Sequence, residues 1–241
     1  MKIREHVFRT LRFYWEKPTA PRYDGGFERP VVVVGSAPIS SVPLGFNPGY
    51  HVITINGSQV VSREWGREKP DVTFMTRNQL QGQNTNAMSV RGAVRGGSTG
   101  LLVMVHWASP LEELTSALRE LEYGYDDLKI LTRMERMALH HTVLGKLNLE
   151  LTSNDRFSNG ITGVLFALAS GAPAVIISGI SPLSSGHVYN DANLQRSHGD
   201  TDAKTLRSLV ERGYPVYTAD AEVGHRIGIP FWKAPTAEQE H

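Results

Sequence analysis

A histidine one short turn before a predicted helix start is the part of this sequence best suited to acid–base chemistry. His198 precedes residues 199–202, which lead into an amphipathic segment predicted to be a helix over 201–212. Histidine is the side chain best matched to proton transfer near neutral pH. A helix N-terminus offers unpaired N–H groups and a positive dipole end, which favour an anionic ligand. The pattern therefore predicts a proton-transferring group beside a bound anion.

Glycine and small polar residues mark another place where an anion or a sugar could bind. Gly35, Ser36 and Ala37 directly follow a run of four valines. Because glycine has no side chain, backbone N–H groups there can approach a phosphate or ribose closely. The segment matches neither a dinucleotide fingerprint nor a P-loop, and a simple turn explains it equally well. Together with the junction at 158–163, it predicts a site for a phosphorylated small molecule.

That second junction holds Asn159, Thr162 and Gly163 at the start of an apolar segment. Thr162 can cap the helix or, with neighbouring N–H groups, hold a carboxylate or phosphate; the sequence favours the cap. Asn56 ends a predicted strand. It belongs either to a turn or to a contact with a base or sugar, because its amide both donates and accepts hydrogen bonds.

Asp200 and Asp202 form a DxD pattern, which in some enzymes holds a divalent cation beneath a diphosphate. The same residues are ordinary in the first turn of a helix, and the sequence favours that interpretation. His187 and His198 match no familiar zinc spacing. We therefore expect no metal and no other cofactor.

Seven short apolar runs, which alternate with helical segments, must position these residues. The run Val31–Val34 is typical of a buried parallel strand. Strands are predicted at 31–34, 51–55, 72–75, 101–106, 128–131, 174–178 and 214–217. The alternation predicts an α/β domain with a doubly wound, mostly parallel, Rossmann-like sheet. Ligands bind beyond the carboxyl ends of such strands, where Gly179 and Tyr189 also fall.

Residues 79–100 are polar and rich in glycine, and they predict a long mobile loop. Arg91 and Arg95 could close over an anionic ligand as a lid and exclude water. A passive surface loop explains the composition equally well.

The composition excludes several classes of protein. Of the 241 residues, 40% are hydrophobic, which is enough for a full core. The net charge of +1 gives no general attraction to nucleic acid, and the absence of cysteine predicts a cytoplasmic protein without disulfides. No apolar run approaches the roughly 20 residues that span a bilayer, and no signal peptide is visible.

Residues 1–30 are predicted to form a basic amphipathic helix and a linker ahead of the α/β domain at 31–241. Apolar side chains follow helical spacing over 1–17 and are interleaved with five lysines or arginines. Tryptophan and tyrosine with basic residues fit peripheral contact with a membrane. A helix that covers an edge of the domain, or a contact between copies of the chain, fits equally well.

The order and spacing of these motifs resemble the bacterial sialyltransferases that decorate lipooligosaccharides with CMP-activated sialic acid. The family has Gly-Asn-Gly-Pro-Ser after a strand, where this sequence has Gly35–Ser36–Ala37–Pro38. It has Cys-Asn at the end of the next strand, where this sequence has Ile55–Asn56. It has Thr-Ser-Gly at the start of a buried helix, where this sequence has Ile161–Thr162–Gly163. Where the family has Ser-Gly-Ile-Asp, a later tyrosine, and a histidine before Thr-Asp, this sequence has Ser178–Gly179–Ile180–Ser181, Tyr189, His198 and Thr201–Asp202. The resemblance covers residues 31–229.

The resemblance implies an inverting, metal-independent glycosyltransferase with one nucleotide-binding domain and a lid. It would move sialic acid, or a related keto sugar such as Kdo, from a CMP donor to a hydroxyl of a glycan or glycolipid. The roles carried over make His198 the general base, Tyr189 a contact of the leaving phosphate, and Asn56 a nucleotide contact. The other expected donor contacts are Gly35, Ser36, Ala37, Asn159, Thr162, Gly163 and Gly179.

Three departures from the family pattern leave alternatives open. Ser36 replaces an asparagine, Ser181 replaces an aspartate, and Leu183 stands where a second phosphate-binding tyrosine would be. One alternative is a catalytically inactive module that binds a nucleotide or sugar. The other is a metal-dependent transferase that uses a nucleoside-diphosphate sugar, with Asp200 and Asp202 as ligands.

Overall fold

The computed structural model describes residues 2–152, 155–182, 186–189 and 198–234. Seven parallel strands form one sheet in the order β5-β4-β3-β2-β1-β6-β7. The strands are β1 (Val31–Val34), β2 (His51–Ile55), β3 (Val72–Thr76), β4 (Ser98–Val105), β5 (Gly124–Leu131), β6 (Val175–Ser178) and β7 (Val216–Thr218). The predicted doubly wound α/β fold is confirmed, with every strand near its predicted place.

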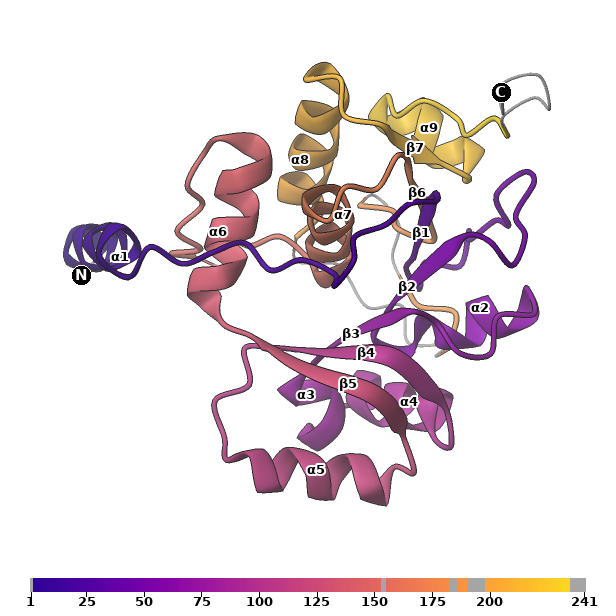
Figure 1. The fold of residues 1–241 in the computed structure, drawn as a ribbon, viewed down its shortest axis with the longest axis horizontal. Coiled ribbons are helices and arrows are strands. Elements are labelled where there is room, and N and C mark those ends of the chain that lie inside the picture. Colours follow the sequence, from indigo (N-terminus) through magenta and orange to yellow (C-terminus); the bar gives the residue numbers. More distant parts are fainter. Residues whose placement is uncertain (1, 153–154, 183–185, 190–197, 235–241) are drawn as a thin grey trace.

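Helices cover both faces of this sheet (Figure 1). One face carries α6 (Arg133–Leu144), α7 (Asn159–Ala169), α8 (Gly199–Glu211) and α9 (Ala221–Ile227). The other carries the 3₁₀ turn η1 (Asn56–Ser58), α2 (Gln59–Glu64), α3 (Arg77–Gln81), α4 (Thr85–Val94) and α5 (Leu111–Glu120). Successive side chains of a strand point to opposite faces of the sheet. Val31 and Val33 therefore pack in the core on the α7 face, and Val32 and Val34 pack in a core on the α2 face.

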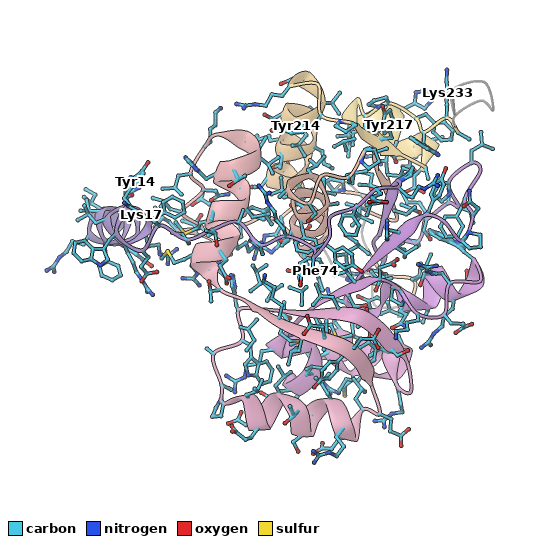
Figure 2. The ribbon with its side chains drawn as sticks, in the orientation of Figure 1. Tyr14, Lys17, Phe74, Tyr214, Tyr217 and Lys233 are labelled. Atoms are coloured by element: carbon cyan, nitrogen blue, oxygen red, sulfur yellow. The ribbon has the colours of Figure 1, made fainter. Side chains whose placement is uncertain are left out.

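The largest core lies beneath α7. Phe74 of β3 is fully buried near the middle of the molecule (Figure 2) and packs edge to face against Phe166 of α7. Gly163 lets this helix approach the sheet, because a Cβ there would lie 3.1 Å from Val33 and 3.2 Å from Ile55. The sequence predicted α7 as a helix that is apolar nearly all round, and it is buried along most of its length.

The predicted irregular loop at 79–100 is wrong, because these residues hold the end of α3, all of α4 and the start of β4. Asn84 caps α4 by accepting a hydrogen bond from the Ala87 N–H at 2.9 Å. Leu80, Val90 and Val94 are buried, whereas Met88 is exposed. A sparse apolar pattern is therefore enough to hold two short helices on the sheet.

The N-terminal segment forms α1 (Lys2–Glu16) and lies at one side of the molecule, next to α6 (Figure 1). Phe13 is buried against the α6 cluster. The Arg9 Nη1 donates to the carbonyls of Leu149 at 2.6 Å and Glu150 at 2.8 Å. No helix within the described residues combines the length and apolar character needed to cross a bilayer.

Candidate active site

The strand order reverses at β1, which pairs with β2 on one side and β6 on the other. Such a reversal opens a crevice beyond the carboxyl ends of the two strands. Here the loops that follow β1 and β6 pack directly on one another. A Cβ on Gly35 would lie 2.3 Å from the Gly179 carbonyl oxygen, and Gly179 itself has φ +62°. Both positions therefore require glycine for loop packing alone, and their contact with a donor stays a prediction.

A buried carboxyl holds these loops in place from the end of β7. Asp220 Oδ2 accepts a hydrogen bond from the Gly179 N–H at 2.7 Å, and Ala37 N–H donates to the Gly179 carbonyl at 2.8 Å. Burial raises the pKa of Asp220 to about 6, while hydrogen bonds from Gly179 and Ser41 act in the opposite direction. Sequence reasoning missed Asp220, although its position directly after a strand was a usable signal.

Ser36 joins the first loop to the segment that carries Tyr189. Its Oγ lies 2.6 Å from His187 Nδ1, and its carbonyl accepts from the Val188 N–H at 2.9 Å. The rings of His187 and Tyr189 stack with centroids 5.1 Å apart. The Tyr189 ring also covers Gly57, where a Cβ would lie 2.9 Å from Cδ1. The structure thus brings Ser36 and Tyr189 to the turn after β2, and adds His187 to the site.

Asn56 occupies that turn in a strained conformation. Its φ is +53°, in the left-handed region that non-glycine residues seldom adopt. Ser58 holds the turn, because its Oγ accepts from the Ile55 N–H at 2.8 Å and donates to the Val34 carbonyl at 2.5 Å. Among the described residues, the buried Asn56 Oδ1 has no hydrogen-bond partner. A ligand that donates a hydrogen bond would satisfy this acceptor, and the contact of Asn56 with a nucleotide stays a prediction.

The α7 start differs from the prediction. Ser158, rather than Thr162, caps the helix, because its Oγ accepts from the Ile161 N–H at 3.3 Å. Thr162 lies one turn inside, fully buried, and its Oγ1 donates to the Ser158 carbonyl at 3.0 Å. Thr162 and Gly163 therefore face the core in this structure, whereas the half-buried Asn159 begins the helix at its open end.

His198 lies at the N-cap of α8, which begins at Gly199, two residues before the start that the sequence predicted. Asp202, one turn later, accepts a hydrogen bond on Oδ1 from the Ser158 N–H at 2.9 Å. Burial raises the pKa of Asp202, and Ser158, His198 and Arg136 counteract that rise. The Asp202 carboxylate thus ties α8 to the α7 start and acts on the imidazole of His198.

The same geometry bears on the DxD pattern. Asp202 is buried and directed toward Ser158, whereas Asp200 is exposed. Over the described residues, no group of three histidine, aspartate or glutamate side chains is arranged to hold a metal ion. Both aspartates belong to the first helical turn, which is the interpretation that the sequence favoured.

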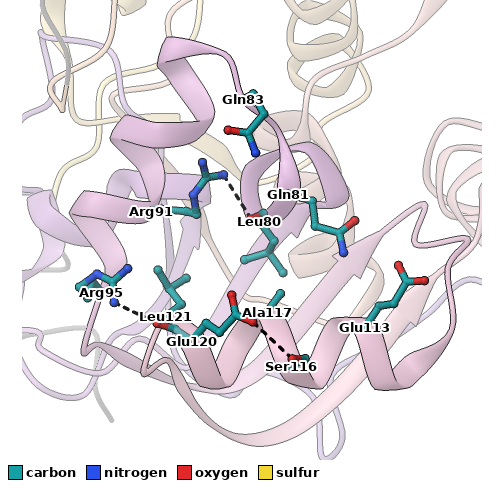
Figure 3. A pocket seen from close by; sticks show the side chains of 10 residues that line it. All are labelled: Leu80, Gln81, Gln83, Arg91, Arg95, Glu113, Ser116, Ala117, Glu120 and Leu121. Carbon is teal, nitrogen blue, oxygen red and sulfur yellow. Dashed lines mark hydrogen bonds between the residues drawn. The ribbon is translucent and has the colours of Figure 1, made fainter.

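The two arginines of the expected lid point elsewhere (Figure 3). Arg91 Nη1 donates to the carbonyls of Leu80 at 3.2 Å and Gly82 at 2.8 Å, and Arg95 Nη1 donates to the Glu120 carbonyl at 2.9 Å. They line a pocket of about 510 Å³ between α3, α4 and α5. In this arrangement neither guanidinium is directed at the β1–β6 crevice, and closure of the segment stays a prediction.

No family model matches the sequence, and no curated protein matches it. Solved structures do. The monofunctional α-2,3-sialyltransferase Cst-I of Campylobacter jejuni aligns with a TM-score of 0.53 and 14% identity, over 84% of this chain and 79% of that one. The chain shares the fold of these sialyltransferases.

Two further structures support that assignment. The apo form of an α-2,3-sialyltransferase from Campylobacter jejuni aligns with a TM-score of 0.52 and 13% identity, over 85% of this chain and 80% of that one. The sialyltransferase CstII of the same organism, in complex with cytidine-5′-monophosphate, aligns with a TM-score of 0.50 and 13% identity, over 87% and 96%. The departure noted at Leu183 lies outside the described residues.

Proposed function

We propose that the protein is an inverting glycosyltransferase that moves a sialic acid or a related keto sugar, such as Kdo or another nonulosonic acid, from a CMP donor to a hydroxyl of a glycan or glycolipid. The observation that carries the proposal is the Tyr189 ring packed on the turn that holds Asn56, beyond the carboxyl end of β2, in a sheet that has the sialyltransferase fold. His198 lies at the start of α8, where a Cβ on the next residue, Gly199, would lie 2.4 Å from the Pro182 carbonyl oxygen, beyond the carboxyl end of β6. Asn56 Oδ1 offers the nucleotide a buried acceptor.

In this mechanism His198 takes the proton of the acceptor hydroxyl. The acceptor oxygen then bonds to the anomeric carbon as the bond from that carbon to the phosphate oxygen breaks, and CMP leaves with the electron pair. The Asp202 carboxylate stabilises the imidazolium that forms, because it acts on His198 from one turn along α8. The Tyr189 hydroxyl donates to the departing phosphate. A single phosphate needs less cationic neutralisation than a diphosphate, so we propose transfer without a metal.

A thermal-shift series tests this donor assignment. We expect CMP to raise the melting temperature more than CDP, UDP or GDP, because the proposed site binds CMP most tightly. A ligand at about 100 times its Kd adds about 2.7 kcal/mol to the free energy of unfolding. Slow release of CMP from CMP-sialic acid without acceptor would separate an enzyme from an inactive binding module. Stabilisation only by diphosphates with manganese, abolished by EDTA, would favour the metal-dependent alternative instead.

We also infer that α1 holds the protein against the cytoplasmic face of an anionic membrane. Large apolar side chains on α1 are strongly exposed: Ile3, Val7, Phe8, Leu11, Tyr14 and Trp15. Arg4, Arg12 and Lys17 lie on or beside the same helix. Anionic lipid attracts each nearby basic residue by about 1 kcal/mol, while tryptophan and tyrosine suit the interface. Phe13 and Arg9 fix the helix to the domain so that this face is presented outward.

Binding to phosphatidylglycerol vesicles should therefore be measurable at low salt and weaken as salt rises. The affinity of the double variant Leu11→Ser/Trp15→Ser for the vesicles should fall at least about tenfold, because two apolar side chains no longer enter the interface. Leu111→Ser removes an exposed apolar side chain from α5, away from α1, and should bind normally. A mass that doubles with concentration, without vesicle binding, would show instead that this face joins two copies of the chain.

A further inference from the structure

A second open cleft lies between α1 and the carboxyl ends of β4 and β5. Its volume is about 530 Å³. Phe8, Arg9 and Arg12 line it from α1, and His106 and Arg133 line it from the sheet side. Neither the donor contacts nor the proposed mechanism uses any of these residues.

His106 combines a strained backbone with a buried ring nitrogen that has no partner among the described residues. Its φ is +57°, and its N–H donates to the Leu131 carbonyl at 2.9 Å, which fixes the strained backbone. Among the described residues, its buried Nε2 has no hydrogen-bond partner. Burial, followed by the charges of Arg136, Arg133 and Arg156, lowers the pKa of His106 to about 4. The imidazole is therefore neutral at physiological pH, and it can bond to a sugar hydroxyl.

Arg133 supplies the positive charge of the cleft. The other two arginines are already paired: Arg9 with Glu5, and Arg12 with Glu16 at 2.6 Å. Arg133 Nε has no hydrogen-bond partner within the described part of the chain. Burial lowers the pKa of Arg133, and the charge of Arg9 acts in the same direction, against an attraction from Glu150. A bound anion would stabilise the charged guanidinium against both its burial and the repulsion from Arg9.

The cleft lies on the same edge of the sheet as the candidate active site. His106 follows β4 and Asn56 follows β2, two strand spacings or about 10 Å apart along the sheet. Arg136 of α6 acts electrostatically on both His106 and Asp202, so one buried cation influences both regions. The cleft is separate from the β1–β6 crevice, so it suits the part of an acceptor that extends away from the reacting hydroxyl.

We propose that this cleft binds an anionic group, a carboxylate or a phosphate, carried by the saccharide acceptor. Arg133 would pair with the anion, and His106 would bond to a neighbouring hydroxyl. The acceptor assignment, though not the binding itself, rests on the proposed transfer reaction. The enzyme would then prefer acidic oligosaccharides to neutral ones of the same length.

Calorimetric titration without donor tests the binding directly. Lactose serves as the neutral probe, 3′-sialyllactose as the carboxylate and lactose 6′-phosphate as the phosphate. We expect at least one acidic probe to bind about tenfold more tightly than lactose, as one charge-assisted hydrogen bond requires. Arg133→Gln should abolish the preference and Arg133→Lys should keep most of it. Arg119→Gln, on the exposed surface of α5, should leave it unchanged.

The outcomes separate the cleft from the reaction. Equal affinity of the wild type for all three probes overturns the inference, even if CMP stabilises the protein and sugar is transferred to lactose. An unchanged acidic preference in Arg133→Gln overturns it as well, provided that circular dichroism shows the variant folded. An acidic preference that depends on Arg133, without stabilisation by CMP or release of CMP from the donor, supports the cleft and contradicts the transferase proposal.

Discussion

Replacing His198 by alanine is expected to lower the rate of sugar transfer by about 10²–10⁴-fold, the usual contribution of a general base. The imidazole lies at the α8 N-cap, and the residue has no other role in the proposed mechanism than to accept the proton of the acceptor hydroxyl. CMP affinity should change little, because the nucleotide contacts proposed above lie elsewhere, in the loops after β1, β2 and β6 and at the start of α7. The measurements are the initial rate with saturating donor and the thermal shift produced by CMP.

Two variants calibrate that loss. Tyr189→Phe removes one hydrogen bond to the leaving phosphate and should cost less than His198→Ala, with the ring still packed on Gly57. His225→Ala removes an exposed histidine of α9 and should transfer sugar at the wild-type rate. If His198→Ala turned over like His225→Ala, the assignment of His198 as the base would be wrong, whatever the donor.

The sheet could be predicted from the sequence because a parallel strand that is buried on both faces consists of a continuous run of apolar residues. Val31–Val34 is the simplest case, with all four side chains buried. The approximate site followed from the same rule, since residues that end neighbouring parallel strands must meet at one edge. Asn56 and Tyr189 are far apart in sequence, yet the Tyr189 ring covers the glycine that follows Asn56.

What the sequence could not supply were partners that only the fold brings together. In the sequence, nothing distinguishes Asp220 from the other aspartates as the partner of Gly179. In the structure, its carboxylate accepts a hydrogen bond from the Gly179 N–H at 2.7 Å. The two helices at 77–94 were mistaken for a loop because their apolar side chains are few. The Asn84 cap and Arg91, which bonds to the carbonyls at the end of α3, add to the burial of Leu80, Val90 and Val94 in stabilising them.

The burial of α6 could not be predicted from the sequence, because arginine is a residue type that is mostly exposed in folded proteins. In the structure, Arg136 and His140 are buried. Arg136 lies over the Phe157 ring at 4.3 Å and donates to the Phe157 carbonyl, directly before Ser158. Its Nε is 3.2 Å from Oε1 of Glu150, which is completely buried. This buried ion pair therefore supports the segment on which Asp202 depends.

Replacing Glu150 by glutamine should consequently destabilise the protein severely. The substitution leaves the Arg136 charge buried without its carboxylate, and the loss of one partner of a buried pair typically costs about 3–5 kcal/mol in the free energy of unfolding. Urea denaturation should show this as a lower midpoint with a similar slope. The matched control is Glu68→Gln, because Glu68 is exposed and lies 3.6 Å from the half-buried Arg63; such a surface pair contributes about 0–1 kcal/mol.

The double variant Arg136→Met/Glu150→Leu distinguishes a buried-charge effect from simple loss of packing. Because it removes both charges together, it should be more stable than Glu150→Gln, even though it also loses the hydrogen bond to Phe157. A double variant as unstable as the sum of its two single variants would mean that the two charges do not interact. Equal stability of Glu150→Gln and Glu68→Gln would mean that water reaches Arg136, and that the Phe157–Ser158 segment is held by the α7 cap and Asp202 alone.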